Sequence, residues 1–409
     1  MSRLQALRPA LPILVGASVM LTLGMGLRQS FGLFMPSLTK DIGIPVAQFT
    51  LAIAVQNLSW GILQPFAGAL AVRLGYRPLM VSGTLAYLLG LVLIATAHGF
   101  LPVLLGGGFA IGLAMACSGS AIAMAVSARA VPSHVRSLVL GMVSAAGSLG
   151  AMIAAPIGQV LLQWGGWRVG VTGFALMATL MVPAAYVAGK VDKDPMPAAA
   201  GAMGAEKASE ALRDAFGSLP FVVMTLAYFV CGMQLIFLTT HLPAYLEICG
   251  MDPMLSAKAL GCIGAFNALG SLFFGWAGGR WNKLLLLGMI YFLRSLTLAW
   301  YFTSAPTPAG TLVFASIMGF LWLGVGPLVQ GWIVDRFGLR WQAMLGGVAF
   351  VSHQVGSFAG AFGGGLLFDS LGNYTLAWQI GVAVGLAAGV TQMAFAFAKN
   401  ARPMAPAAA

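Results

Sequence analysis

The sequence contains very little charge. Of its 409 residues, 8% are charged, 59% are hydrophobic and only 10 are acidic. This composition, with a mean hydropathy of +0.91, excludes an ordinary soluble globular domain. No acidic residue lies well inside a long apolar stretch, and Glu247, Asp335 and Asp369 all fall near the ends of such stretches. The sequence therefore lacks the buried carboxylates that commonly carry protons or attract cations in membrane carriers.

Residue patterns that catalyse reactions or bind metals are also missing. The four cysteines, Cys117, Cys231, Cys249 and Cys262, show neither paired spacing nor a metal-ligand pattern. We expect them to be small buried hydrophobic residues. The sequence contains no recognisable Ser-His-Asp arrangement and no cluster of metal ligands. We predict that the protein is not an enzyme and that it uses no metal or cofactor.

The sequence does contain long apolar runs. Twelve of them fit the ~30 Å hydrocarbon core of a bilayer, since a helix rises about 1.5 Å per residue. They cover approximately residues 12–35, 47–71, 78–97, 101–127, 137–162, 168–188, 220–246, 256–279, 284–303, 309–334, 343–368 and 375–398. The alternating segments of a membrane β-barrel are absent. We predict an all-α integral membrane protein with twelve transmembrane helices, the first of them retained and not cleaved as a signal peptide.

The basic residues are distributed unevenly along the chain. The net charge of +11 is compatible with a nucleic-acid partner, but position argues against one. With the N-terminus inside, the inner tails and connections carry Arg3, Arg8, Arg73, Arg77, Arg129, Arg136, Lys190, Lys193, Lys207, Arg213, Arg280, Lys283, Arg336, Arg340, Lys399 and Arg402, and the outer ones carry only Lys40, Arg168 and Lys258. This asymmetry follows the positive-inside rule. It predicts the lipid bilayer as partner, no nucleic acid, and cytoplasmic termini; the compact loops suit a bacterial inner membrane.

The longest polar segment divides the sequence into two halves. Residues 189–218 hold five of the ten acidic residues, with six apolar runs before them and six after. We expect residues 1–188 to form one six-helix bundle and residues 219–409 to form a second bundle with a short tail. Residues 189–218 would be a cytoplasmic linker that includes a short surface helix. Duplicated halves of this kind are common in transporters, and we expect a monomer.

The two halves share a short pattern of glycine and basic residues, and this pattern resembles a family motif. Gly68 precedes Arg73 by five residues, as Gly275 precedes Arg280. The chain resembles the major facilitator superfamily over nearly its whole length. The superfamily's helix 2–3 motif, roughly G-x-L-a-D-r-x-G-r-r, is matched here at Gly68, Leu70, Arg73, Gly75 and Arg77. The resemblance implies gating roles for Arg73, Arg77 and Arg280. The sequence departs at Val72, where the family's aspartate helps to lock the outward-open state, so the lock would differ or be weaker.

Within that superfamily, the chain is most similar to the monocarboxylate transporters and their bacterial relatives, including oxalate–formate antiporters. The stretches that carry this resemblance are Arg28 to Phe34, Ala146 to Gly150 with Ala155 and Pro156, Gly166 to Arg168, and Phe368 to Tyr374. Monocarboxylate transporters have an aspartate and an arginine four residues apart in helix 8. The matching positions here are Asn267 and Ser271, so the usual proton-linked ion pair is missing.

Arg28 is the leading candidate for contact with a substrate. It lies in the first apolar run with no acidic residue within ten positions on either side. A charge at membrane depth costs roughly 2.5–3.5 kcal/mol on insertion scales. A visiting anion would be its partner, because a guanidinium can hold a carboxylate through two parallel hydrogen bonds. The resemblance places it near a functional lysine of monocarboxylate transporters. The alternative is that Arg28 snorkels to the outer surface, ~10 Å away.

Other buried polar residues have two interpretations each. Arg294 lies near the middle of its run, where it either contacts substrate or bonds helix-end carbonyls and braces a neighbouring helix. Asn267 either bonds a substrate or joins two helices. The same choice applies to Asn57, Gln234 and Gln330, and to Gln56 and Tyr228. The glycine runs at Gly106 to Gly112 and Gly356 to Gly365 are expected to be packing faces.

Two histidines complete the candidates. His353 lies deep in its run beside Gln354, and an imidazole titrates near pH 6.5, so it is a candidate for substrate contact and proton coupling. The alternative is a neutral histidine bonded to a neighbouring helix. His241 lies closer to the outer end of its run and is either an outer gate residue or an ordinary interfacial histidine.

These features predict a secondary transporter of small organic anions, chiefly monocarboxylates, that works by alternating access. Coupling would use a cotransported proton, a proton carried on the substrate, or exchange for a counter-anion. The first alternative is a multidrug or metabolite exporter, since 22 Met and 25 Phe could line an adaptable pocket. A non-transporting receptor built on a transporter fold is the second.

Overall fold

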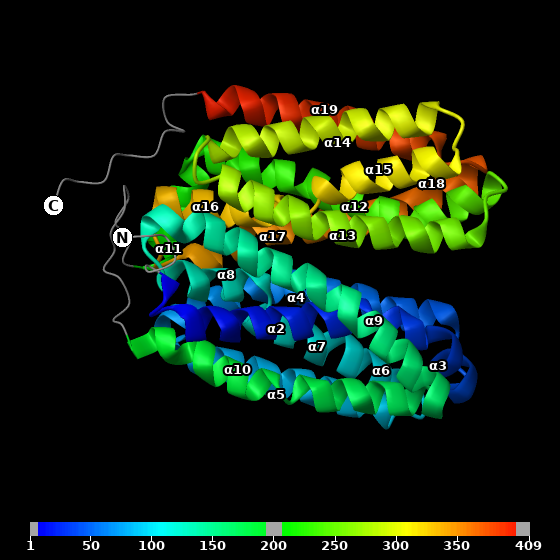
Figure 1. The fold of residues 1–409 in the computed structure, drawn as a ribbon, viewed down its shortest axis with the longest axis horizontal. Helices are drawn as coiled ribbons and strands as arrows, with labels where there is room; N and C mark the ends of the chain where they lie inside the picture. The colour runs from blue at the N-terminus through cyan, green and yellow to red at the C-terminus, as the bar shows by residue number, and fades with distance from the viewer. Residues whose placement is uncertain (1–6, 194–206, 398–409) are drawn as a thin grey trace. The chain divides into compact units, whose positions relative to one another are not determined.

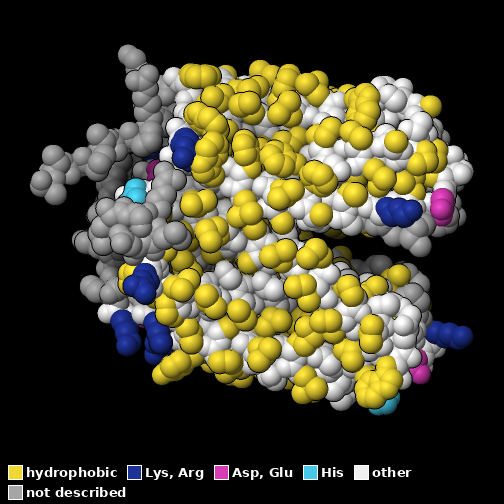
Figure 2. All heavy atoms as spheres, in the orientation of Figure 1, with side chains coloured by type: hydrophobic (Ala, Val, Ile, Leu, Met, Phe, Trp, Pro, Cys, Tyr) yellow, Lys and Arg dark blue, Asp and Glu magenta, His cyan; other side chains and the backbone are white. Residues whose placement is uncertain are grey.

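The computed structural model describes residues 7–193 and 207–397 (Figure 1). The two tails and the middle of the predicted linker lie outside these residues. All regular structure within the described ranges is helical, and nine helical segments there are long and apolar enough to cross a membrane. On the face drawn in Figure 2, hydrophobic side chains cover the helices and charged side chains lie near helix ends. The all-α membrane architecture is confirmed, and the count of twelve spans stays a prediction.

Contacts divide the chain into two compact units. Unit 1 comprises Met1–Ala198 with Leu339–Gly347, and unit 2 comprises Ala199–Gly338 with Val348–Ala409. Residues 7–193 contain α2 (Leu11–Gln29), η1 (Phe31–Phe34), α3 (Met35–Ile42), α4 (Val46–Leu74), α5 (Tyr76–Ala95), α6 (Phe100–Val103), η2 (Leu104–Ala110), α7 (Ile111–Ser118), α8 (Ser120–Arg129), α9 (Ser133–Ala178), α10 (Met181–Ala188) and η3 (Gly189–Lys193).

The remaining described residues form the second set of helices. They are α11 (Ala208–Gly217), α12 (Leu219–Ile248), α13 (Pro253–Ala277), α14 (Lys283–Thr303), α15 (Pro308–Phe320), α16 (Val325–Phe337), α17 (Gln342–Phe358), η4 (Ala359–Gly363), α18 (Gly364–Leu371) and α19 (Thr375–Ala396). Helix α11 is the short helix expected in the linker. Asn282 begins α14 by accepting hydrogen bonds from the amides of Leu284 and Leu285, as N-cap residues do.

The glycine runs pack helices together as predicted. A Cβ on Gly112 would lie 2.9 Å from the carbonyl oxygen of Gln56 on α4, so these two backbones are in close contact. Gly356 and Gly360 face the carbonyls of α12 in the same way. In lipid there is little hydrophobic drive between helices, so small residues stabilise the bundle by letting backbones approach.

Helices α2 and α9 show the same kind of contact. Gly26 lies against Gly150, and Gly150 also lies against the Thr22 carbonyl. The Thr22 hydroxyl donates to the carbonyl of Ala146 at 2.9 Å. This explains why Ala146 to Gly150 is rich in small residues: the stretch is the surface on which the Arg28-bearing helix packs.

The stretch from Gly166 to Arg168 holds the predicted outer connections in place. Helix α9 breaks at Gly166, whose φ of +78° suits glycine alone. Trp167 then donates to Asp41 at 3.0 Å, while Arg168 pairs with Asp41 and donates to the Ala97 carbonyl at 2.9 Å. The bonds from Arg168 and Trp167 hold the pKa of Asp41 below its usual value.

The tenth apolar run is not a continuous helix. The run predicted over residues 309–334 is divided, because α15 ends at Phe320 and α16 begins at Val325. The turn from Leu321 to Gly324 removes backbone groups from helical pairing. Groups of this kind need other partners inside a bilayer, and the side chains that supply them are among the predicted site residues.

The α2–α9 contact makes a testable prediction. Substituting Gly150→Ala places a methyl group into the Thr22 carbonyl and forces the helices apart, so the apparent melting temperature in detergent should fall. Gly261→Ala on α13 is the matched control, since a Cβ there meets nothing within 4 Å. Alanine improves helix propensity by up to about 1 kcal/mol, so the control should melt at the same temperature or higher. Equal melting of both variants would contradict the packing role of Gly150.

Candidate functional site

Arg28 lies at the end of α2 and reaches α4. Its Nε donates to Oε1 of Gln56 at 2.9 Å, and its Nη2 donates to Oδ1 of Asn57. The guanidinium carbon stands 5.0 Å from the ring centroid of Trp60, within cation–π range. The side chain therefore turns toward the neighbouring helix of unit 1 and does not follow the snorkelling alternative.

The acceptor oxygen of Gln56 is directed toward Arg28 by a local irregularity. Gln56 is 1% exposed, and its Nε2 donates to the Gly107 carbonyl at 2.6 Å. Gly107 lies in the π-helical turn η2, where the amide of Ile111 bonds the Gly106 carbonyl. After this turn the backbone returns to α-helical hydrogen bonds, and the change of spacing leaves the carbonyl of Gly107 without a backbone amide donor. That free carbonyl takes the amide nitrogen of Gln56, and the amide oxygen is left for the guanidinium.

Asn57 is oriented in the same manner. Its Nδ2 donates to the Ile53 carbonyl at 3.0 Å, which leaves Oδ1 to accept from Arg28. One turn further, Trp60 donates to Gln64 at 3.0 Å, and Gln64 donates to the Ala116 carbonyl at 3.0 Å. These side chains form a polar face on α4, which packs on η2 and α7.

Among the described residues, the charge of Arg28 is met by neutral groups alone. Both of its hydrogen-bond acceptors are amide oxygens, and no carboxylate of the described residues pairs with it. A guanidinium carries five N–H donors. The hydrogen bonds found among the described residues use Nε and Nη2, so Nη1 keeps its donors, and the side chain is half-buried. This arrangement can bind an anion without first breaking an ion pair.

Arg294 has a different environment. It is fully buried on α14, and its Nε and Nη2 both donate to the Leu321 carbonyl at 2.9 and 2.7 Å. Nη2 also donates to the Trp322 carbonyl at 2.8 Å, and Nη1 lies 3.3 Å from the Cys231 sulfur. The acceptors are carbonyls freed where α15 ends. This geometry favours the interpretation that Arg294 stabilises a helix end.

Asn267 supports the other side of the same break. It is 7% exposed on α13, and its Oδ1 accepts from the Leu323 amide at 2.9 Å. Arg294 thus donates to the free carbonyls at this helix break, and Asn267 accepts from a free amide at the same break. Gln330, one and a half turns into α16, is also buried.

His353 and Gln234 lie in aromatic and helix-bridging environments. The His353 ring stacks on Phe350 at 5.3 Å between centroids and packs edge-on against Tyr228 at 4.8 Å. Its Nδ1 lies 3.2 Å from the Gln354 amide oxygen and 3.4 Å from the Ser357 hydroxyl oxygen. Gln234 donates to Ser295 at 2.9 Å and to the Gly381 carbonyl at 3.0 Å, which joins α12 to α14 and α19.

His241 is held at the far end of α12. Its Nε2 lies 2.9 Å from the Ala361 carbonyl in the π-helical turn η4, and its Nδ1 lies 3.3 Å from the Tyr374 hydroxyl. The ring therefore donates through Nε2 and accepts through Nδ1. The residue links α12 to the connection between α18 and α19, and its proposed gate role stays a prediction.

Comparison with known proteins identifies the family. A sequence model of the Major Facilitator Superfamily matches residues 14–361. The chain belongs to the major facilitator superfamily. It is 26% identical to monocarboxylate transporter 13 of Bos taurus, covering 92% of this chain and 86% of that one, and 24% identical to the uncharacterised MFS-type transporter YcxA of Bacillus subtilis, covering 90% and 91%. The fucose:proton symporter FucP of E. coli has the same fold, with a TM-score of 0.74, 16% identity, and 95% and 99% coverage.

This superfamily member is therefore a multi-pass membrane transporter, and its helix 2–3 motif can be located in unit 1. Arg73 is exposed in the last turn of α4. The Arg77 guanidinium stands 4.5 Å from the Tyr186 ring centroid. Arg280 is exposed in the turn after α13, 4.1 Å from the Trp276 ring centroid. The gating roles expected for these three residues stay predictions.

Two residues of these sites were missed by the sequence analysis. Trp60 follows Gln56 by four residues and precedes Gln64 by four, a spacing that places all three on one helix face and could have revealed it. Asp192 was assigned to the linker, but it accepts from the amides of Tyr76 and Arg77 at 3.0 and 2.8 Å. The Oδ1 atom that accepts from Tyr76 also lies 3.8 Å from Nη1 of Arg129. The distance between these residues in the sequence concealed both contacts.

The role of Arg294 can be tested by substitution. Arg294→Gln should leave the Leu321 and Trp322 carbonyls without donors inside the bundle, which costs about 1–3 kcal/mol for each buried group. We expect a lower apparent melting temperature in detergent. The matched control is Arg28→Gln, which removes an arginine from another apolar span. This variant should lower the melting temperature much less. A stable Arg294→Gln protein that has lost uptake would instead assign Arg294 to substrate contact.

Proposed function

We propose that the protein is a secondary transporter of small organic anions, chiefly monocarboxylates, that works as a monomer by alternating access in a bacterial inner membrane. One observation carries the proposal: Arg28 is charged, lies in the first transmembrane segment and is held by neutral amides alone among the described residues. The 26% identity to a monocarboxylate transporter supports the same substrate class.

The geometry gives Arg28 the properties of an anion receptor. Gln56 and Asn57 fix the guanidinium from one side, and Trp60 supports it through the ring. The donors that remain can bind a carboxylate in the two-bond arrangement that arginine favours. Because the amide partners are uncharged, arrival of the anion neutralises the charge of a half-buried guanidinium. The bound state is therefore favoured over the empty one, which gives the substrate its affinity.

Uptake into proteoliposomes tests this role. We expect saturable uptake of one of a panel of labelled carboxylates, such as acetate, lactate, pyruvate, formate or oxalate, by the wild-type protein. Hydrogen bonds to a charged group contribute about 1.5–3 kcal/mol, so Arg28→Gln should weaken apparent affinity by about 10- to 100-fold. Arg28→Lys keeps the charge but loses the planar guanidinium, so its apparent affinity should lie between those of the wild-type protein and Arg28→Gln.

Arg213→Gln on α11 is the matched control, because it removes an exposed arginine and should transport normally. Melting temperatures establish that each variant is folded. Wild-type uptake by Arg28→Gln would remove the anion clamp from this proposal. Absence of uptake for every carboxylate, together with efflux of a lipophilic dye, would support the exporter alternative.

Coupling through His353 is a separate part of the proposal. Its imidazole lies deep in α17 with a neutral amide as its hydrogen-bond partner. If this ring carries the coupled proton, His353→Gln should retain exchange of labelled for unlabelled anion and should lose stimulation of uptake by an inward proton gradient. His98→Gln, which changes an exposed histidine, is the control. Gradient stimulation that survives in His353→Gln would exclude the role.

A further inference from the structure

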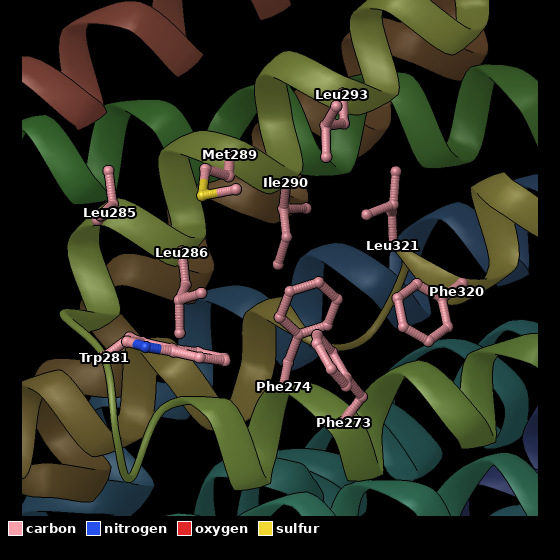
Figure 3. Close-up of a pocket in the computed structure, with 10 residues that line it drawn as sticks. All are labelled: Phe273, Phe274, Trp281, Leu285, Leu286, Met289, Ile290, Leu293, Phe320 and Leu321. Carbon is pink, nitrogen blue, oxygen red and sulfur yellow. The ribbon is translucent and has the colours of Figure 1, made fainter.

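An apolar groove lies on unit 2, and at one end it adjoins the contact between Arg294 and the Leu321 carbonyl. Its volume is about 410 Å³, and it is bounded by the end of α13, one side of α14 and the end of α15. Figure 3 shows Trp281 at one end and Leu321 at the other, with the rings of Phe273 and Phe274 facing the aliphatic side chains of α14.

The groove does not suit the proposed carboxylate substrate. All of its lining side chains are hydrophobic, with Trp281 contributing the one polar atom, an indole N–H at the end. Sites for small polar molecules normally add a few placed polar groups that fix orientation. Several lining residues are instead open to the surroundings of the bundle: Phe273 is 41% exposed, Met289 42% and Leu293 42%. In a membrane protein such a surface faces lipid.

Positive charge is concentrated at one end of the groove. Arg280 is exposed beside Trp281, and its guanidinium lies 4.1 Å from the ring centroid of Trp276, which itself contacts Trp281 at 5.5 Å. No carboxylate within the described ranges pairs with Arg280. The neighbouring Lys283 is different, because it pairs with Asp335 at 2.6 Å. The free charge at this end is therefore that of Arg280.

The charge of Arg280 indicates which kind of molecule would bind in the groove. A hydrocarbon chain gains little by moving from bulk lipid into an apolar groove, because both surroundings are equally apolar. Selection among lipids must come from the head group. Arginine binds phosphate through two parallel hydrogen bonds, and indoles are favoured at the membrane–water interface. The distribution of basic residues predicts that this turn lies on the cytoplasmic side, where basic pockets between helices bind anionic head groups.

We propose that this groove binds an anionic glycerophospholipid of the inner leaflet. One acyl chain lies along α14 between Trp281 and Leu321, and the phosphate is held by Arg280 with the indole N–H of Trp281 beside it. Trp276 stiffens the arginine by cation–π contact, which reduces the freedom lost on binding. The site is independent of the anion clamp at Arg28.

Lipid titration tests the proposal on the full-length protein. The purified protein in detergent is titrated with phosphatidylglycerol and with phosphatidylcholine of the same acyl chains, and bound lipid is counted by native mass spectrometry. We expect the wild-type protein to prefer phosphatidylglycerol. Arg280→Gln should reduce that preference about fivefold, as expected for one basic contact at an anionic membrane surface. Arg213→Gln should leave it unchanged.

A second pair of variants tests the groove itself. Met289→Trp fills the groove and should remove one bound phosphatidylglycerol molecule, whereas Leu296→Trp, two turns along the same helix and 44% exposed, should not. An unchanged preference in Arg280→Gln, an equal loss in Arg213→Gln, or full binding by Met289→Trp would each overturn the proposal. Because anion uptake is not the readout, failure here is distinguishable from failure of the transport proposal.

Discussion

The structure depends on one constraint: hydrogen-bonding groups inside hydrocarbon must find partners within the protein. Regular helices meet this constraint alone, so the informative places are those where a helix is irregular. The π-helical turn η2 releases the Gly107 carbonyl, which Gln56 takes. The break after α15 releases carbonyls and an amide, which Arg294 and Asn267 take. Each of these two irregularities is thus paired with polar side chains that fit it.

The two membrane arginines meet the same constraint in different ways, and the difference bears on the roles proposed for them. Arg294 donates to backbone carbonyls, which cannot move without unwinding a helix, so an arriving anion would have to disrupt the fold to engage it. Arg28 donates to side-chain amides, so its bonds can be exchanged without unwinding a helix, and it retains unused donors among the described residues. A guanidinium that serves transport must release its ligand as well as bind it. Only the second arrangement permits that exchange at low energetic cost.

The sequence was sufficient to predict the class of fold and the leading candidate, for physical reasons. Hydropathy and charge asymmetry are properties of whole segments, so they can be read from the sequence without knowledge of contacts. An arginine in an apolar run is costly wherever it packs. The break at Leu321 to Gly324 was missed because hydropathy stays high across it, although Gly324, Gly326 and Pro327 were a local signal of an interruption. The orientation of Gln56 also required the structure, since it depends on a π-helical turn in another helix.

The substitution at Val72 illustrates the remaining limit of motif reasoning. A motif records where a carboxylate usually stands in sequence, whereas packing requires only that some carboxylate reach the donors. Here Asp192, from η3, accepts from the first amides of α5 and approaches Arg129. The positive end of a helix dipole and its free amides attract a carboxylate from any segment that passes nearby. A missing acidic residue in a motif therefore predicts a changed local sequence, and it does not by itself predict a missing interaction at that end of the bundle.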